Sequence, residues 1–147
     1  MKPDWTLIAN STRARLLQQE PGAPMVILES FVHPASRSPA RGDVGERAGQ
    51  PQSRRIEGAA LAASLGALHE ALTHFARELG HLLEQEAQLD HFGSLTVFAS
   101  RPFLHELDEQ FGKCTRRRLT RLHEMDLTDC TVSEIEERIA HEVAAAR

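Results

Sequence analysis

Large apolar residues recur at three- and four-residue steps through the middle of the chain. The series consists of Leu61, Leu65, Leu68, Leu72, Phe75, Leu79, Leu82 and Leu83. This spacing predicts a single amphipathic α-helix from about Ala59 to Gln88, weakened slightly by Gly66 and Gly80. A chain of 147 residues is long enough to bury one core around a sheet of about four or five strands without disulfides or a structural metal. We therefore expect one domain over residues 1–147.

Three strand patterns precede this helix. The segments from Thr6 to Asn10 and from Ala14 to Gln18 have the composition of short strands, and the residues between them are polar turn formers. Together they predict a β-hairpin. The segment from Met25 to Val32 is apolar and β-branched and follows a Pro-Gly turn, which makes it the strongest strand pattern in the chain.

Two strand-helix pairs follow the long helix. Ser94 to Ser100 has the composition of a buried strand, and a helix with Pro102 in its first turn follows it. Leu119 to Leu127 alternates in character and predicts a fifth strand. Thr131 to Glu134 is a capping-box pattern, which predicts the start of a last helix. The apolar stripes of the two helices are Phe103, Leu104, Leu107 and Phe111, and then Ile135, Ile139 and Val143.

The predicted order of elements is therefore βββ-α-β-α-β-α. Strands joined by crossover helices are parallel, whereas strands joined directly are antiparallel. We therefore expect an α/β protein with a mixed sheet. The ribonuclease-H-like fold has this arrangement, although a fold by itself does not transfer a function.

A segment of different composition separates the third strand from the long helix. From His33 to about Glu57 the chain is rich in Pro, Ser, Arg, Gly and Gln, and its large apolar residues are Val44 and Ile56. So few apolar residues bury too little surface to offset the entropy lost on ordering. We expect a flexible loop over residues 33–57. Loops of this length are usually functional or disordered, and the sequence leaves open whether this one is catalytic, binds a partner or is only disordered.

The composition of the chain limits the kinds of partner, bound metal and cellular location that we expect. The 17 Lys and Arg against 21 Asp and Glu give a formal charge of -4, which argues against a wholly basic nucleic-acid-coating protein but permits a basic patch. Cys114 and Cys130 form no CxxC pair, so a disulfide scaffold or zinc site has little support. The first apolar stretch, Leu7 to Ala9, is too short for a signal peptide or membrane span. We expect a cytoplasmic protein without membrane association.

Arginines are the candidate nucleic-acid contacts. The densest basic run lies between the second helix and the fifth strand and contains Arg116, Arg117, Arg118 and Arg121. Two pairs add to it: Arg13 with Arg15 after the first turn, and Arg54 with Arg55 in the loop. These residues are suited to contact the phosphates of ribosomal RNA or tRNA. A solvated connector and structural salt bridges explain the same residues, and a sequence does not choose between these interpretations.

Neither a metal nor a cofactor is predicted. His69 and His74 are five residues apart, not the four that would place both on one helix face in a zinc-protease pattern. A metal-dependent nuclease on this fold needs converging carboxylates, one of them within the first strand, and Thr6 to Asn10 has none. Asp108, Glu109, Asp126 and Asp129 are better explained as helix-surface and turn residues.

Four segments, in this order along nearly the whole chain, resemble the bacterial host attachment protein family. They are residues 5–16 (WTLIANSTRARL), 31–37 (FVHPASR), 99–104 (ASRPFL) and 125–139 (MDLTDCTVSEIEERI). The family is named for attachment of bacteria to host cells. It is distantly similar to the central domain of archaeal and eukaryotic class I peptide-release factors.

The release-factor resemblance implies a catalytic loop. In those factors a mobile loop between the third strand and the long helix carries Gly-Gly-Gln, and its Gln reaches the peptidyl-tRNA ester. Gly49 and Gln50 stand in the same place here, and the resemblance implies that they are catalytic. The chain departs from the pattern because Ala48 replaces the first glycine and Pro51 follows the glutamine.

Three functional hypotheses follow. The favoured one is a translation-associated accessory protein that binds ribosomal RNA or tRNA through the arginines and the loop. The second is a protein-interaction module that is required indirectly for attachment to host cells. The third is a peptidyl-tRNA or ester hydrolase that uses Gly49 and Gln50.

Overall fold

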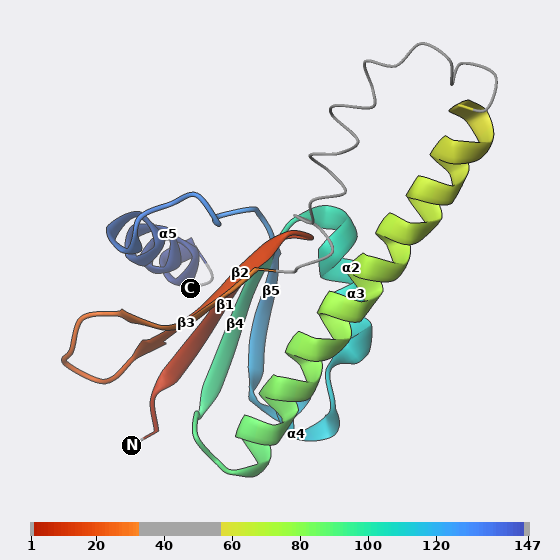
Figure 1. Ribbon diagram of the computed structural model, residues 1–147. Coiled ribbons are helices and arrows are strands. Elements are labelled where there is room, and N and C mark those ends of the chain that lie inside the picture. The colour runs from red at the N-terminus through yellow and green to blue at the C-terminus, as the bar shows by residue number, and fades with distance from the viewer. Residues whose placement is uncertain (1, 33–56, 146–147) are drawn as a thin grey trace.

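The computed structural model describes residues 2–32 and 57–145, which form a mixed five-stranded sheet with helices on both faces (Figure 1). The elements in chain order are β1 (Asp4–Ala9), β2 (Arg13–Gln19), β3 (Val26–Val32), α2 (Glu57–Gln88), β4 (Ser94–Ala99), α3 (Arg101–Gln110), α4 (Lys113–Arg118), β5 (Leu119–Glu124) and α5 (Val132–Ala145). The predicted α/β class with a mixed sheet is confirmed.

The strands lie in the order β3-β2-β1-β4-β5. β1 pairs antiparallel with β2, and β2 pairs antiparallel with β3, as expected for strands joined directly. β1, β4 and β5 run parallel to one another because helices connect them. The carboxyl ends of these three strands therefore meet at one end of the sheet, at the top of Figure 1.

One face of the sheet, covered by α2, α3 and α4, holds the larger part of the core. The strands place the buried side chains of Leu7, Leu16 and Val97 on this face. The helices add Phe75, Leu79 and Leu83 from α2 and Phe103 and Leu107 from α3. Each fully buried side chain of this size stabilises the fold by roughly 1.5–3 kcal/mol. In the second half of the predicted amphipathic helix, the apolar residues spaced three and four apart thus pack on the sheet.

The opposite face, called here the α5 face, has a smaller core. Ile8, Leu17 and Phe98 project from the sheet and pack against the fully buried Ile135 of α5. The capping box predicted at Thr131 is present: its hydroxyl oxygen accepts from the amide of Glu134 at 3.1 Å, and the Glu134 carboxylate accepts from the amide of Thr131 at 2.7 Å.

The element order differs from the predicted one by an additional helix, α4. The basic run expected to be a connector forms this helix, whose first amides are bound by the carboxylate of Glu84 on α2. The predicted fifth strand is also shorter and ends at Glu124. After it, Asp126 accepts hydrogen bonds from the amide and hydroxyl of Thr128 and turns the chain toward α5.

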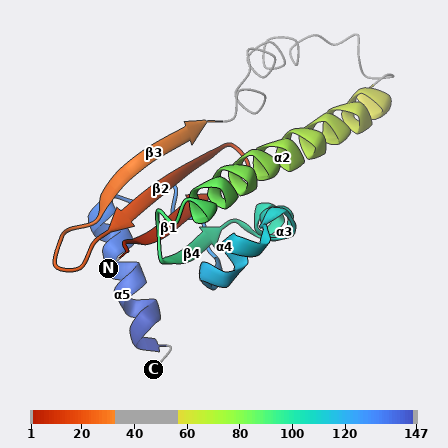
Figure 2. The same ribbon diagram turned by 90° about the horizontal axis from the view of Figure 1, so that it is seen from below.

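The amino half of α2 extends beyond the sheet, as two perpendicular views show (Figures 1 and 2). None of the helices in the described ranges is both long and apolar enough to span a membrane. Residues 33–56 lie outside the described residues, and so does the flexible loop expected there.

Candidate functional site

Segments far apart in sequence meet at the carboxyl end of the parallel strands. Asn10, which follows β1, donates from its amide to Asp126 at 3.1 Å and to the Thr128 hydroxyl at 3.0 Å. Its side-chain oxygen accepts from the amides of Thr12 and Arg13, both at 2.9 Å. One side chain thus joins the β1-β2 turn to the loop after β5, more than a hundred residues away.

The predicted RNA contacts Arg13 and Arg15 lie at this end of the sheet, where both are engaged within the protein. Arg13 forms an ion pair with Asp129. The guanidinium of Arg15 donates to the carbonyl oxygens of Leu127, at 3.1 Å, and Cys130. Arg15 therefore holds the loop that leads into α5 through Nη2, and its buried Nε has no hydrogen-bond partner among the described residues.

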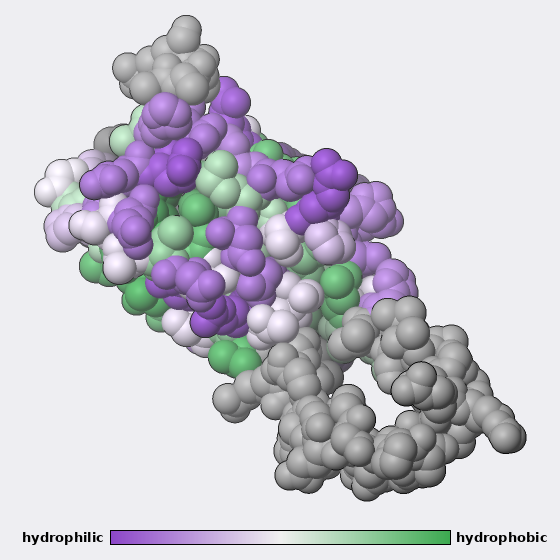
Figure 3. All heavy atoms as spheres, turned by 90° about the horizontal axis from the view of Figure 1, so that it is seen from above, coloured by the Kyte–Doolittle hydropathy of each residue, from purple (hydrophilic) through white to green (hydrophobic). Residues whose placement is uncertain are grey.

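Carboxylates at this end have hydrogen-bonding or cationic partners. Burial raises the pKa of Asp126, but the hydroxyl and amide of Thr128, the Asn10 amide and the Arg13 charge together lower it below its ordinary value. Arg101, at the start of α3, pairs with Glu124 at 2.9 Å. Figure 3 looks onto this end and shows hydrophilic side chains (purple) over much of it. The end is polar, but its arginines are already paired.

Two arginines of the predicted basic run are also engaged. Arg116 pairs with Asp108 at 3.1 Å. Arg118 pairs with Asp90 at 2.8 Å and lies over the ring of Phe92, 5.9 Å from the centroid. It also donates to the carbonyl oxygens of Phe92 and Cys114. These contacts join α4 to the segment before β4, so Arg118 has a structural role in the fold.

The other two arginines of this run are exposed. Arg117 on α4 and Arg121 on β5 have no hydrogen bond or ion pair with any residue that the structure describes. The register places Arg121 beside Thr96, on the α5 face, whereas α4 lies on the other face. The predicted patch is thus divided between the two faces of the sheet.

Four predicted site residues lie outside the described part of the chain. They are Gly49 and Gln50, implied as catalytic, and Arg54 and Arg55, predicted to contact RNA. Their roles stay predictions.

Histidines of α2 contact glutamates. His69 lies 3.9 Å from Glu106, and His74 lies 3.0 Å from Glu78. Within residues 2–32 and 57–145, no group of three His, Cys, Asp or Glu side chains is arranged to hold a metal ion.

The edge of the sheet presents a surface that the sequence did not locate. β3 pairs with β2 on one side, and no other described strand pairs with it on the other. Val26, Ile27, Leu28 and Val32 are 42–47% exposed, although this was the strongest strand pattern in the chain. Apolar β-branched composition predicts a strand, but the same composition occurs in central strands and at edges. Only the sheet order shows that this strand is an edge.

A comparison with protein-family models gives a match over residues 5–139, to the family described as "Protein required for attachment to host cells". The chain belongs to this family. The match spans the four segments on which the resemblance was based and confirms it. Three of them, residues 5–16, 99–104 and 125–139, contribute to the carboxyl end of the sheet described above. No curated protein matches the chain.

Proposed function

We propose that this protein is a protein-interaction module in attachment to host cells, and that the partner docks on the free edge of β3. The observation that carries the proposal is the exposure of four large apolar side chains on one edge strand. Edge strands usually carry charges, prolines or short lengths that prevent pairing with other chains. β3 has seven residues, of which Glu29 is the one charged residue, and a bulge at Leu28 leaves residues 29–32 as the regular part of the edge. An edge of this kind suits strand addition.

The hydrogen-bond register indicates which backbone groups face outward. The amide of Asn10 donates to the carbonyl oxygen of Arg13, so these two form a hydrogen-bonded pair of the β1-β2 hairpin. Bonded and non-bonded pairs alternate along antiparallel strands. Arg15 therefore bonds toward β1, and its partner on β3, Ser30, directs its amide and carbonyl outward. The same alternation applies to Val32, the partner of Arg13.

The partner that fits this edge is an extended segment with apolar side chains and a basic residue opposite Glu29. Main-chain hydrogen bonds to Ser30 and Val32 would supply affinity, and side-chain pairs across the strands would supply specificity. A basic residue is favoured because a like charge opposite Glu29 would be repelled.

The test is Ser30→Pro, with Ser30→Thr as the matched control. Proline removes an outward amide without removing a hydrogen bond to β2, and prolines are tolerated on edge strands. In cells lacking the native gene, Ser30→Pro should fail to restore attachment to host cells, whereas Ser30→Thr should restore it. Equal attachment by the two variants, at equal abundance and equal thermal stability, would rule out docking on this edge.

A second proposal retains the translation hypothesis. It is supported by exposed and unengaged arginines, although Arg117 and Arg121 lie on different faces of the sheet, and by a strand order and directionality that suit a ribonuclease-H-like, release-factor-like domain. It places the protein in the cytoplasm. Sedimentation with ribosomes at roughly 50 and 200 mM salt tests it, because phosphate contacts weaken steeply over that range. Salt-sensitive association that is lost in Arg117→Ala with Arg121→Ala supports the proposal, and absence of association at both salt concentrations excludes it.

A third proposal assigns ester hydrolysis to Gly49 and Gln50. Its support is the sequence resemblance alone. Gln50→Ala should abolish hydrolysis of a peptidyl-tRNA while the circular dichroism spectrum is unchanged. A wild-type rate in this variant would end the proposal.

A further inference from the structure

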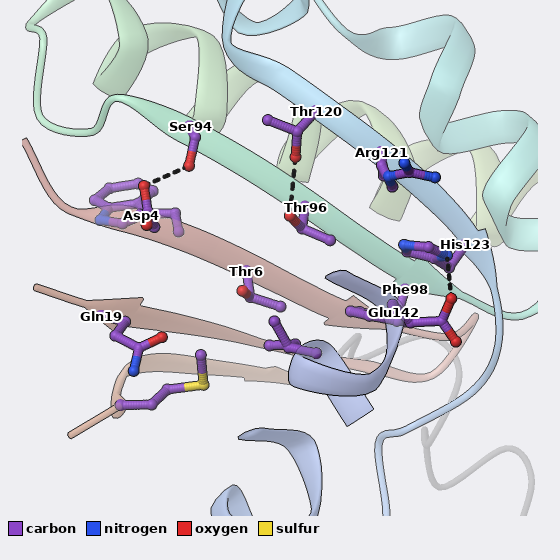
Figure 4. A pocket seen from close by; sticks show the side chains of 13 residues that line it. Asp4, Thr6, Gln19, Ser94, Thr96, Phe98, Thr120, Arg121, His123 and Glu142 are labelled. Carbon is purple, nitrogen blue, oxygen red and sulfur yellow. Dashed lines mark hydrogen bonds and ion pairs between the residues drawn. The ribbon is translucent and has the colours of Figure 1, made fainter. Parts of the chain in front are cut away.

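A groove of about 380 Å³ lies on the α5 face of the sheet, beside α5 (Figure 4). It lies over the amino ends of β1 and β4. Asp4 and Ser94 lie at one end of it, His123 and Glu142 lie at the other, and Thr6 lies between them. The volume is within the usual range for sites that bind small molecules.

The strand register explains why this part of the face is open. Parallel pairing of β1 with β4 sets Thr6 beside Thr96 and Ile8 beside Phe98. Along the α5 face, both strands therefore change from polar to apolar side chains at the same level. α5 packs on the apolar pair through Ile135, and the polar pair lines the groove. The groove therefore depends on the side chains of two paired strands that are about ninety residues apart in the sequence.

The donor in each hydrogen bond between hydroxyl groups on the floor of the groove can be assigned. The Thr120 hydroxyl donates its single proton to the carbonyl oxygen of Leu95 at 3.0 Å. In the 3.0 Å contact between Thr96 and Thr120, the donor is therefore Thr96. At the amino end, Ser94 donates to Asp4 at 2.6 Å. These three hydroxyl protons are used within the protein.

Thr6 differs from these hydroxyl residues. It is 4% exposed, it lines the groove, and its hydroxyl has no hydrogen-bond partner among the described residues. Among the described residues, Arg15 Nε is the buried side-chain atom without a hydrogen-bond partner, so the Thr6 hydroxyl is not sealed in the core but is open to the groove. The Thr6 hydroxyl is available to a bound molecule.

Charged side chains lie at both ends of the groove. Glu142 lies 3.7 Å from His123, whose ring stacks on Phe98 at 4.6 Å. Asp4, at the opposite end, accepts the hydrogen bond from Ser94 and has no cationic partner among the described residues. Arg121 is the lining cation without a carboxylate partner in the part of the chain that the structure describes. Apolar wall is supplied by Phe98, Met25 and Ile139.

We propose that this groove binds a small organic anion with an apolar body. Arg121 pairs with its carboxylate or phosphate group, Thr6 donates a hydrogen bond to it, and Phe98, Met25 and Ile139 cover the apolar part. Guanidinium groups bind both kinds of anion well. The proposal does not depend on docking at β3, because neither Ser30 nor Val32 lines the groove.

Three probes with the same aromatic body test the ligand class by isothermal titration calorimetry: naphthyl phosphate, naphthoate and neutral naphthylmethanol. We expect at least one anion to bind roughly tenfold or more tightly than the neutral alcohol. The tighter of the two anions identifies phosphate or carboxylate as the preferred group. Binding that is equal for all three, or undetectable for all three, would overturn the proposal.

A matched pair of variants locates the site. Arg121→Gln removes the charge in the groove and should weaken anion binding about tenfold, while leaving the alcohol unaffected. Arg117→Gln removes an equally exposed charge on the other face and should leave anion binding unchanged. The ring of Trp5 stacks on Phe92 at 4.5 Å in the core of the opposite face, so calorimetry and not fluorescence is the reading for both variants. Equal binding by the two variants, both with wild-type thermal unfolding, would overturn the assignment of Arg121.

Discussion

Thr6 provides a prediction at the scale of one residue. Thr6→Val replaces a hydroxyl that is open to the groove and has no described partner by a methyl group of similar size. We expect the free energy of unfolding to change by less than about 0.5 kcal/mol, or about 1–2 °C in Tm, because no hydrogen bond within the protein is lost. Thermal unfolding followed by circular dichroism measures the change.

The matched control is Thr96→Val, one strand away. Thr96 donates to Thr120, so its loss removes a formed hydrogen bond and should lower stability by roughly 0.5–1.5 kcal/mol. The same substitution at neighbouring positions thus has effects of different expected size. If Thr6→Val were as destabilising as Thr96→Val, the Thr6 hydroxyl would have to be hydrogen-bonded within the free protein.

The arginines show what a sequence reveals at this scale and what it does not. Arg13 and Arg15 form a motif that suits RNA contact equally well as structure. The structure shows Arg15 donating to Leu127 and Cys130, more than a hundred residues away. No local pattern encodes those partners, since they are backbone carbonyls whose position depends on where β5 and α5 lie. Residue type predicted the chemistry of the side chain but not its partner.

At the scale of elements, Gly80 is a point of close approach between α2 and the end of α3. The sequence predicted only that this glycine weakens the helix. A Cβ at Gly80 would lie 2.7 Å from the carbonyl oxygen of Gln110, which belongs to the backbone of α3. Gly80→Ala should therefore destabilise the protein, although alanine gains roughly 1 kcal/mol in helix propensity. We expect a net loss of about 1–3 kcal/mol in urea unfolding, because the two helices must separate.

Gly66, in the same helix, is the control. A Cβ there meets no described atom within 4 Å, so Gly66→Ala should stabilise the protein by roughly 0.5–1 kcal/mol. Gains in both variants would show that α2 and α3 can move apart freely at Gly80.

Glu84 joins α2 to α4, and its ionisation makes this junction sensitive to pH. Burial raises its pKa, but hydrogen bonds from the amide and hydroxyl of Thr115, the amide of Cys114 and the Gln88 side chain outweigh burial and lower the pKa from 4.5 to about 2. A group whose pKa is lower in the folded state stabilises the fold above its unfolded-state pKa, and this contribution is lost as pH falls through the folded-state value. The window for Glu84 is therefore between 4.5 and about 2.

Glu84→Gln should reduce the free energy of unfolding by about 1 kcal/mol at neutral pH, a modest value because water screens the partly exposed carboxylate. The difference from wild type should shrink as pH falls toward about 2, where the native carboxylate is also protonated. Urea unfolding across this range measures it, with Glu70→Gln, an exposed position on α2, as control. A difference that is independent of pH would show that Glu84 acts through shape and not through charge.

Elements were predicted more successfully than their surroundings. The period of the apolar residues and the helix-capping patterns predicted the five strands and the helices α2, α3 and α5. Their predicted bounds lie within a few residues of the observed ones, because those signals are local. α4 was missed because its amino end is held by Glu84, about thirty residues earlier, and not by a local cap. The exposure of β3 and the groove were missed for a related reason: both depend on which strands lie side by side.

At the scale of the whole molecule, the two proposed binding surfaces occupy different parts of one sheet. β3 forms one edge, and β5, which carries Arg121, forms the other. Ser30 lies toward the carboxyl end of β1 through its pairing with Arg15, whereas the groove lies at the amino end of β1. Substitutions at sites that share no contacts usually have additive effects.

We therefore expect Ser30→Pro to abolish attachment without changing the affinity of the groove for naphthyl phosphate or naphthoate. Arg121→Gln should weaken anion binding about tenfold without changing strand addition at β3. The double variant should show both effects at their single-variant sizes. If anion binding instead altered attachment by the wild type but not by Arg121→Gln, the sheet would couple the two surfaces, and the groove would be a regulatory site for docking at β3.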